Sequence, residues 1–257
     1  MRSISSRKSD RVKELVRLHK KSDRHEAGLF LAEGPAVVHT ALYYSRDRVV
    51  EVFALEELVD QYVGFDCPVT VCSPEVIAAL SGTQSPQGVI ALCRIPEDLV
   101  SEIVQSSKTV VVVDNISDPG NLGTIIRTAD ATAAAGVLLY GNCVDPYNDK
   151  VVRSSAGSIF RVPIATLDSI SDLPSSRSVY TLVAHADLTL PELEVSAVTA
   201  PQTWVIGSEA HGISPEWNSR IPAPISVSIP MADGVESLNA AIAASICLYA
   251  HYLRPTS

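Results

Sequence analysis

A strand-to-helix junction near residue 120 combines a charged side chain with a position at which ligands often bind. The segment runs from Asp114 to Asp130, with a Pro-Gly turn after a predicted strand and a helix that begins near Asn121. One face of that helix is apolar and consists of Leu122, Ile125, Ile126 and Ala129. Arg127 lies on the opposite face, near the carboxyl end of the strand, where open α/β sheets bind their ligands. Arg127 is therefore a candidate site residue, and a surface arginine without such a role is the simpler alternative.

A second segment, Gly207-Ser-Glu-Ala-His-Gly212, directly follows another predicted buried strand. Two glycines this close to a strand end indicate a backbone that approaches a ligand. Glu209 can accept hydrogen bonds in such a site, or it can cap the loop itself. We interpret His211 as a polar loop residue and not as a base.

A third segment runs from Ile229 to Asn239 and leads into a helix that we expect to reach about Leu253. Ser237 is placed to cap this helix. Because the helix is small and apolar nearly all round, we expect it to be buried on all sides. Asn239 stands at the helix entrance, where a polar side chain is a candidate for binding a ligand.

The three segments belong to a series of alternating strands and helices. The strand before the first segment, 109–114, is a continuous β-branched run, which is typical of a strand buried on both faces of a parallel sheet. Further strands are predicted at 137–140, 160–164, 179–184, 203–206 and 225–229. This alternation predicts an α/β domain with a mostly parallel sheet covered by helices on both faces.

The N-terminal part of the chain predicts a smaller α/β unit. Short strands and helices alternate up to about residue 95, after a basic helix at 7–21. Pro96 marks a break, so we expect domains at 1–95 and 108–257, joined by a linker at 96–107.

The charge of the chain is unevenly distributed. The net charge is −9, but residues 1–25 contain nine Lys or Arg and three acids, whereas the remaining residues contain 11 and 26. A basic arm on an acidic body is consistent with local phosphate contacts, and a solvated helix face is the alternative. Arg7, Lys8 and Arg11 are the candidate contacts to nucleic acid within this arm.

The composition excludes several classes of protein. Hydrophobic residues make up 46% and charged residues 19%, an ordinary globular mixture. No apolar run approaches the ~18 residues that a membrane helix needs, and no apolar segment follows the basic N-terminus as in a secretory signal. The five scattered cysteines form no zinc pattern and are best interpreted as free thiols in the cytoplasm. We therefore expect a cytoplasmic protein without a metal site.

Taken together, the three segments resemble motifs 1, 2 and 3 of the SpoU (TrmH-like) RNA ribose 2′-O-methyltransferases, a family of the SPOUT superfamily. The residues that carry the resemblance are 121–127, 207–212 and 229–239. The resemblance covers roughly residues 108–254, and 150–158 is similar to the mid-domain stretch of the family. Residues 1–95 resemble more loosely the small α/β substrate-binding domain of many members.

The resemblance implies a trefoil knot in the C-terminal parallel-sheet domain and a homodimer. It implies that S-adenosylmethionine binds in the knot through Gly207, Ile229 and Leu238. It also implies that RNA is the substrate and that Arg127 is the catalytic base. A guanidinium seldom gives up its proton, so a phosphate clamp that orients the ribose is an equal alternative for this residue.

Further site residues follow from the same resemblance. Glu209 and Asn239 match essential positions of the family, and Ser237 is a weaker candidate for the same site. Asn121 and Arg127 are candidate contacts to RNA.

The leading interpretation is an S-adenosylmethionine-dependent RNA ribose 2′-O-methyltransferase. The separate N-terminal domain favours ribosomal RNA over transfer RNA as the substrate. A catalytically silent RNA-binding protein of the same fold is the alternative, and the intact Arg127, Glu209 and Asn239 argue against it. A nucleotide-dependent oxidoreductase is disfavoured, because Gly120 and Gly123 do not complete the Gly-x-Gly-x-x-Gly spacing.

Overall fold

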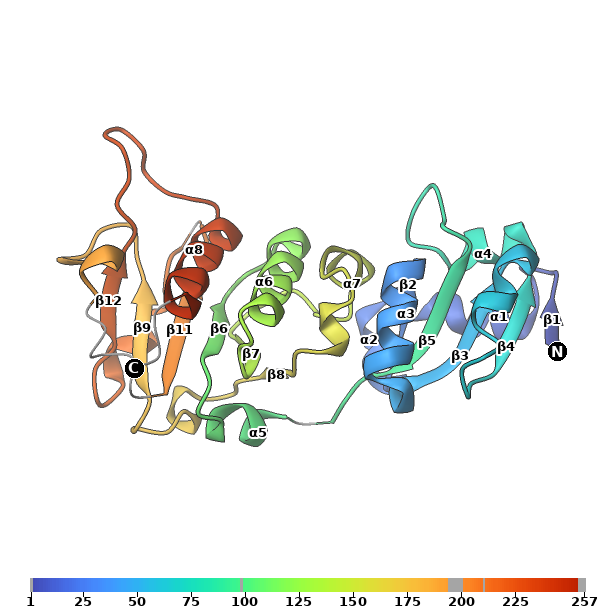
Figure 1. Ribbon diagram of the computed structural model, residues 1–257, viewed down its shortest axis with the longest axis horizontal. Helices are drawn as coiled ribbons and strands as arrows, with labels where there is room; N and C mark the ends of the chain where they lie inside the picture. Colours follow the sequence, from blue (N-terminus) through green and yellow to red (C-terminus); the bar gives the residue numbers. More distant parts are fainter. Residues whose placement is uncertain (1, 98, 194–200, 210, 254–257) are drawn as a thin grey trace. The chain divides into compact units, whose positions relative to one another are not determined.

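The chain divides into two units, each built on its own sheet (Figure 1). The first unit consists of Met1–Glu97 together with Asp145–Arg161, and the second of Asp98–Val144 together with Val162–Ser257. The computed structural model describes residues 2–97, 99–193, 201–209 and 211–253. Within these ranges, every helix is too short or too polar to cross a bilayer.

The second unit contains a seven-stranded sheet in which all neighbouring strands are parallel, in the order β10-β12-β9-β11-β6-β7-β8. Its strands are β6 (Val110–Asp114), β7 (Gly136–Tyr140), β8 (Ile164–Thr166), β9 (Ser178–Leu182), β10 (Leu188–Thr189), β11 (Gln202–Gly207) and β12 (Ile225–Ser228). Every residue of β6 is buried, as expected for a β-branched strand covered on both faces. The predicted parallel α/β architecture is confirmed.

Two long helices of this unit pack against each other and begin at the sites of the first and third segments. They are α6 (Pro119–Ala131) and α8 (Ala240–Tyr252). Asp118 caps α6, because its Oδ1 accepts a hydrogen bond from the backbone N–H of Asn121 at 2.8 Å. The buried residues of α6 include the predicted apolar face, and Arg127 is exposed. Among the described residues, the remaining helical elements of the unit are α5 (Val100–Gln105), η4 (Ile170–Asp172), η5 (Leu190–Glu192) and η7 (Pro215–Ser219).

Two predictions of local structure in this unit are wrong. The strand expected at 160–164 is a 3-10 turn, η3 (Ser158–Phe160), and β8 begins only after Pro163. Proline has no N–H to donate to a neighbouring strand, which explains why the strand starts later. The linker expected at 96–107 contains helix α5.

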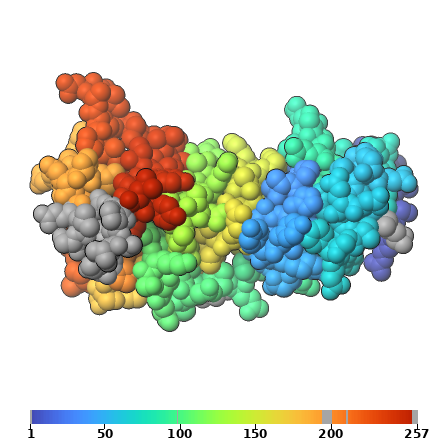
Figure 2. Space-filling view, viewed as in Figure 1, coloured from blue at the N-terminus to red at the C-terminus, as the bar shows by residue number. Residues whose placement is uncertain are grey.

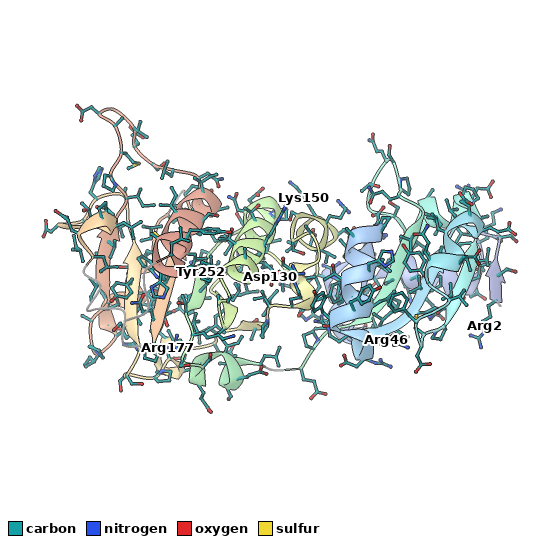
Figure 3. All side chains as sticks on the ribbon, in the orientation of Figure 1. Arg2, Arg46, Asp130, Lys150, Arg177 and Tyr252 are labelled. Carbon is teal, nitrogen blue, oxygen red and sulfur yellow. The ribbon has the colours of Figure 1, made fainter. Side chains whose placement is uncertain are left out.

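Arg177 is a buried cation that joins the beginnings of two central strands of this sheet (Figure 3). Its guanidinium donates hydrogen bonds to the carbonyl oxygens of Lys108 at 2.7 Å and Gln202 at 2.5 Å. Its Nε donates to the hydroxyl of Thr203 at 3.0 Å. Burial lowers the pKa of Arg177 to about 10, so the side chain stays charged at neutral pH. The sequence contained no signal for this contact.

The first unit contains a five-stranded mixed sheet in the order β1-β4-β3-β5-β2. Its strands are β1 (Arg2–Ile4), β2 (Leu29–Glu33), β3 (Val49–Ala54), β4 (Val69–Cys72) and β5 (Val89–Arg94), and β5 is antiparallel to both of its neighbours. Its helical elements are α1 (Asp10–Arg17), α2 (Lys21–Ala27), α3 (Pro35–Tyr44), α4 (Pro74–Leu80), α7 (Asp149–Ser154), η1 (Arg46–Arg48), η2 (Glu56–Gln61) and η3. Strands β1 and β2 were not predicted.

The basic N-terminal segment is part of the fold of this unit and not a separate arm. The helix expected at 7–21 is two helices, α1 and α2. The apolar stripe of α1 explains its position, because Val12 and Leu15 are buried in the core together with residues of α4. Arg24 is also buried, with 2% of its surface exposed.

The partner of Arg24 comes from the distant segment 145–161. The Nε and Nη2 atoms of Arg24 donate to Oδ2 of Asp145 at 2.9 and 2.5 Å. Two aromatic rings of the same segment, Tyr147 and Phe160, lie 4.8 and 5.9 Å from the ring of Phe30 on β2. The sequence analysis assigned this segment to the second domain. Its apolar side chains instead pack in the first unit and complete the core of that unit.

We expect Asp145→Ala to destabilise the first unit by about 3–5 kcal/mol, because it leaves a cation buried without its carboxylate. The urea midpoint of unfolding measures this loss. The double variant Arg24→Met, Asp145→Leu should regain most of it, since an apolar pair of similar size removes both charges. A single variant as stable as the unchanged chain would contradict this account.

The pair His19–Asp149 makes the stability of the first unit depend on pH. Nδ1 of His19 lies 2.8 Å from Oδ2 of Asp149. This hydrogen bond raises the pKa of His19 above its ordinary value of 6.5 and outweighs burial, which acts in the opposite direction. Burial acts to raise the pKa of Asp149, but the hydrogen bond and charge of His19 hold it below 3.8.

The stabilisation by this pair should be complete below pH 6.5 and lost as the pH rises through the raised pKa of His19. At the acid end it should be lost as the pH falls below 3.8, through the lowered pKa of Asp149. We expect His19→Gln to cost at most about 1 kcal/mol, with a larger cost at about pH 5.5 than at about pH 8.5. Urea titrations at both pH values measure the difference. His25→Gln, at an exposed position of α2, is the matched control, and an equal pH dependence in both variants would contradict the assignment.

Candidate active site

The loop that follows β11 is shaped by two glycines that contact each other. A Cβ atom on Gly207 would overlap the carbonyl group of Gly212. The N–H of Gly212 donates to the carbonyl of Ser208 at 2.8 Å, and Gly212 has φ +67°, a conformation that favours glycine. The glycines therefore close the turn of their own loop, and this turn carries Glu209.

Glu209 joins the three segments that the sequence analysis singled out. Its Oε1 accepts hydrogen bonds from Nδ2 of Asn121 at 2.7 Å and from Nδ2 of Asn239 at 3.3 Å. The backbone N–H of Ala240 donates to the same oxygen at 3.1 Å. The two amides also contact each other, since Nδ2 of Asn239 donates to Oδ1 of Asn121 at 2.9 Å. Three residues proposed from separate motifs thus form one hydrogen-bonded cluster.

Asn239, and not Ser237, caps helix α8. Its Oδ1 accepts hydrogen bonds from the N–H groups of Ala241 at 3.0 Å and Ile242 at 3.2 Å. The helix begins at Ala240, two residues later than a Ser237 cap would require, so that prediction is wrong. Asn239 uses its carbonyl oxygen for the helix and its amide nitrogen for Glu209 and Asn121.

A cavity of about 190 Å³ lies beside this cluster, at the carboxyl ends of β9, β11 and β12. Its lining includes all three residues expected to bind the cofactor, Gly207, Ile229 and Leu238, together with Glu209 and Ser237. Leu182, at the end of β9, also lines the cavity and was missed by the sequence analysis. Because β9 pairs with β11 in the sheet, the ends of both strands reach the same place.

The lining suits a ligand with an apolar ring and a cationic group. Leu182, Ile206 and Leu238 supply apolar walls of the kind that accept a purine base. The carboxylate of Glu209 adds negative charge at the same cavity. An adenosyl group bearing a sulfonium combines these two properties, so the residues present fit S-adenosylmethionine.

A fully buried carboxylate, Asp114, holds the far end of the Glu209 loop. Its Oδ2 accepts from the N–H of Ser214 at 2.7 Å and from Nε1 of Trp217 at 3.1 Å. Its Oδ1 accepts from the hydroxyl of Ser214 at 2.6 Å and from Nδ2 of Asn115 at 2.7 Å. The end of β6 thereby fixes where the loop after β11 returns to the sheet.

The other proposed residues lie outside this cluster. Arg127 is exposed on α6 and is absent from the lining of the cavity. His211 is exposed, and its backbone N–H donates to the hydroxyl of Ser208. In the first unit Arg7 and Lys8 are exposed, whereas Arg11 is paired with Glu51 at 3.0 Å.

Residues 108–249, more than half of the chain, match the SpoU rRNA Methylase family. The chain belongs to this family. Residues 9–91 match the MRM3-like substrate binding domain. The resemblance inferred from the three motifs is therefore confirmed, and it extends over both units.

Named relatives cover nearly the whole chain. The 23S rRNA (guanosine(2553)-2′-O)-methyltransferase RlmP of Bacillus subtilis is 31% identical over 97% of this chain and 98% of its own length. The solved AdoMet-bound rRNA methyltransferase from Sinorhizobium meliloti is 28% identical, with a TM-score of 0.82 over 97% of both chains. The SpoU methyltransferase AviRb from Streptomyces viridochromogenes, solved in complex with AdoMet, is 27% identical, with a TM-score of 0.83 over 95% of this chain and 97% of its own.

We expect Asn239→Ala to lower stability by about 1 kcal/mol, because α8 loses its N-cap. Asn239→Ser restores a capping oxygen but supplies no amide to Glu209 and Asn121, so its stability should be close to that of the unchanged protein. Both variants should lose methyl transfer by about tenfold or more, because the cluster is no longer held in place. Urea midpoints and transfer rates separate the two functions of Asn239, and a fully active Ser variant would show that only the cap matters.

Proposed function

We propose that this protein transfers a methyl group from S-adenosylmethionine to the 2′-hydroxyl of a ribose in ribosomal RNA. The observation that carries the proposal is the hydrogen-bonded cluster of Asn121, Glu209 and Asn239 beside a cavity lined by Gly207, Ile229 and Leu238. Two relatives, from Bacillus subtilis and Sinorhizobium meliloti, are named rRNA methyltransferases, and the S. meliloti protein and the SpoU methyltransferase AviRb were solved with AdoMet. Only RNA offers a 2′-hydroxyl, so the reaction itself selects RNA over DNA.

The chain contributes mainly positioning to this reaction. The cofactor supplies an electrophilic methyl group on a positively charged sulfur, and the charge disappears as the methyl group leaves. The protein must therefore hold two reactants in line more than it must neutralise a leaving group. Glu209 fixes the beginnings of α6 and α8 relative to the cavity, because it binds a side chain from each.

Arg127 is the residue that we assign to the ribose. It is exposed on α6, the helix that contains Asn121, so it can contact a large substrate outside the cavity. It can serve there as the base that takes the hydroxyl proton or as a clamp on the adjacent phosphate. Both roles require the guanidinium at the reacting nucleotide.

An exposed apolar stripe on α8 supports a homodimer. The helix was expected to be buried on all sides, but Ile242 is 52% and Leu253 73% exposed, and Ile246 and Tyr249 are also exposed. These residues repeat at helical spacing along one side of α8, which forms part of the surface in Figure 2. A second copy would cover them, and because α6 packs against α8, it would also lie close to Arg127.

Two further parts of the proposal rest on the family resemblance. We propose that α8 is threaded through a loop of the second unit as a trefoil knot. We also propose that the protein acts in the cytoplasm, where free ribosomal RNA and the cofactor occur together.

Ribose-methylation mapping of ribosomal RNA with and without the gene tests the function. One 2′-O-methylated nucleotide should disappear with the gene, and the purified protein should restore it in unmodified ribosomal RNA supplied with S-adenosylmethionine. Cofactor binding without any methylated product would favour the catalytically silent RNA-binding protein. A methylated product found in transfer RNA alone would show that transfer RNA is the substrate, and the proposed reaction would stand.

We expect Arg127→Ala to lower the rate of methyl transfer by at least about a hundredfold, comparable to the loss of a donor that stabilises a transition state. Cofactor affinity should stay within a few-fold, because Arg127 does not line the cavity. Arg127→Lys keeps a positive charge but not the planar fork, so partial activity in it would show that a cation at this position contributes without the bidentate geometry. Single-turnover rates and calorimetric cofactor binding measure the two effects, and normal turnover by the Ala variant would refute the assignment.

A further inference from the structure

Exposed aromatic rings occur at two places in the described part of the chain. Tyr249 belongs to the stripe on α8 that we assign to a second copy, and Tyr252 lies on the same helix. Tyr43 and Tyr44 lie at the end of α3, with 71% and 64% of their surfaces exposed. Nothing in the cofactor site or in the proposed dimer accounts for this second pair.

Tyr43 is supported on one side by neighbouring rings. Its ring lies 5.2 Å from that of Phe65 in an edge-on arrangement and 6.4 Å from that of His39. His39 in turn stacks at 5.1 Å on Tyr62, which is fully buried. The ring is thus held at the surface by packing beneath it. We call His39, Tyr43, Tyr44 and Phe65 the α3 aromatic surface.

Cationic side chains lie next to the same surface. The guanidinium carbon of Arg161 stands 5.1 Å from the centre of the Tyr44 ring. Arg46 is in the turn that directly follows α3 (Figure 3). Aromatic rings with adjacent arginines are the combination with which proteins bind single-stranded nucleic acid, because bases stack on the rings and phosphates pair with the cations.

The α3 aromatic surface is separate from the basic residues of α1. Leu31 of β2 packs in the core with α1 and α4. Phe30, the preceding residue of the same strand, points to the other face of the sheet, where it stacks on Phe160. Phe160 belongs to η3, which contacts α3. Helices α1 and α3 therefore cover opposite faces of one sheet.

We propose that the α3 aromatic surface stacks unpaired bases of the substrate RNA. The inference rests on the proposed function for the presence of RNA and adds where and how the first unit binds it. Stacking suits this chain, because the residues after position 25 contain 26 acids and 11 Lys or Arg, so a broad basic surface is not available there. Stacking contributes affinity through the π-face of a base and needs no added positive charge.

The test uses the full-length protein and an unmodified fragment of ribosomal RNA. Tyr43→Ala and Tyr44→Ala should each weaken RNA binding by about tenfold, within the range for loss of one stacked base. Tyr43→Phe and Tyr44→Phe keep a ring and should bind within about twofold of the unchanged protein, since stacking does not need the hydroxyl. Cofactor affinity and thermal midpoints should not change, because both side chains are exposed and belong to the first unit.

Salt dependence separates stacking from charge. The slope of log affinity against log salt should be the same for the Ala variants as for the unchanged protein. The charge variant Lys8→Gln, Lys13→Gln should flatten this slope by roughly 0.7 for each phosphate contact that it removes. Like the Tyr variants, it changes only exposed residues of the first unit.

Unchanged RNA affinity in both Ala variants would overturn the inference. If their oligomeric state in sedimentation were altered at the same time, the surface would be a protein interface. An equal loss of RNA affinity in the Phe variants would also overturn the inference. Failure of the proposed function has a different signature, since the unchanged protein would then bind the RNA without methylating it. In that case the comparison of Ala and Phe variants still decides whether bases stack on α3.

Discussion

One carboxylate oxygen organises the candidate active site. Oε1 of Glu209 accepts hydrogen bonds from Asn121 in the first turn of α6, from the residue that caps α8 and from the first N–H of α8. The donors come from positions 121, 239 and 240, so this contact brings together parts of the chain that are more than 100 residues apart in sequence. It can do so only because Gly207 and Gly212 turn the loop tightly and Asp114 anchors its far end. These same contacts determine the shape of the cavity next to Glu209.

A second constraint acts on the first unit and connects it to the rest of the chain. The ion pair of Arg24 with Asp145 is buried, and the segment that supplies Asp145 leaves the second unit and returns to it. A substrate-binding domain that ended near residue 95 would lack Asp145, Tyr147 and Phe160, and it would keep a buried cation without its partner. The first unit therefore needs a segment that lies within the range matched to the SpoU family, although the two sequence matches fall on separate ranges.

The sequence was most informative where local patterns decide the structure. The β-branched run of β6, the apolar face of α6 and the three motifs predicted the parallel sheet and the residues that meet at Glu209. Contacts between distant segments could not be predicted in this way. Nothing in the local sequence around Arg177 or Asp145 indicates a buried charge, because only the folded chain brings their partners close. The same reason explains why Ser237 was mistaken for the cap, since Asn239 is fixed by Glu209.

The N-terminal residues show that a count of charges in the sequence does not by itself identify a binding surface. Of the nine cations in residues 1–25, Arg24 is buried against Asp145 and Arg11 is paired with Glu51, so neither is available to a phosphate without breaking an ion pair. Of those that remain, Lys13 and Arg17 lie on α1, which its apolar stripe holds against the core. An acidic protein that must bind RNA then gains from contacts that do not depend on charge. Exposed rings supported from beneath, such as Tyr43, supply such contacts at a small entropic cost, because packing has already fixed their orientation.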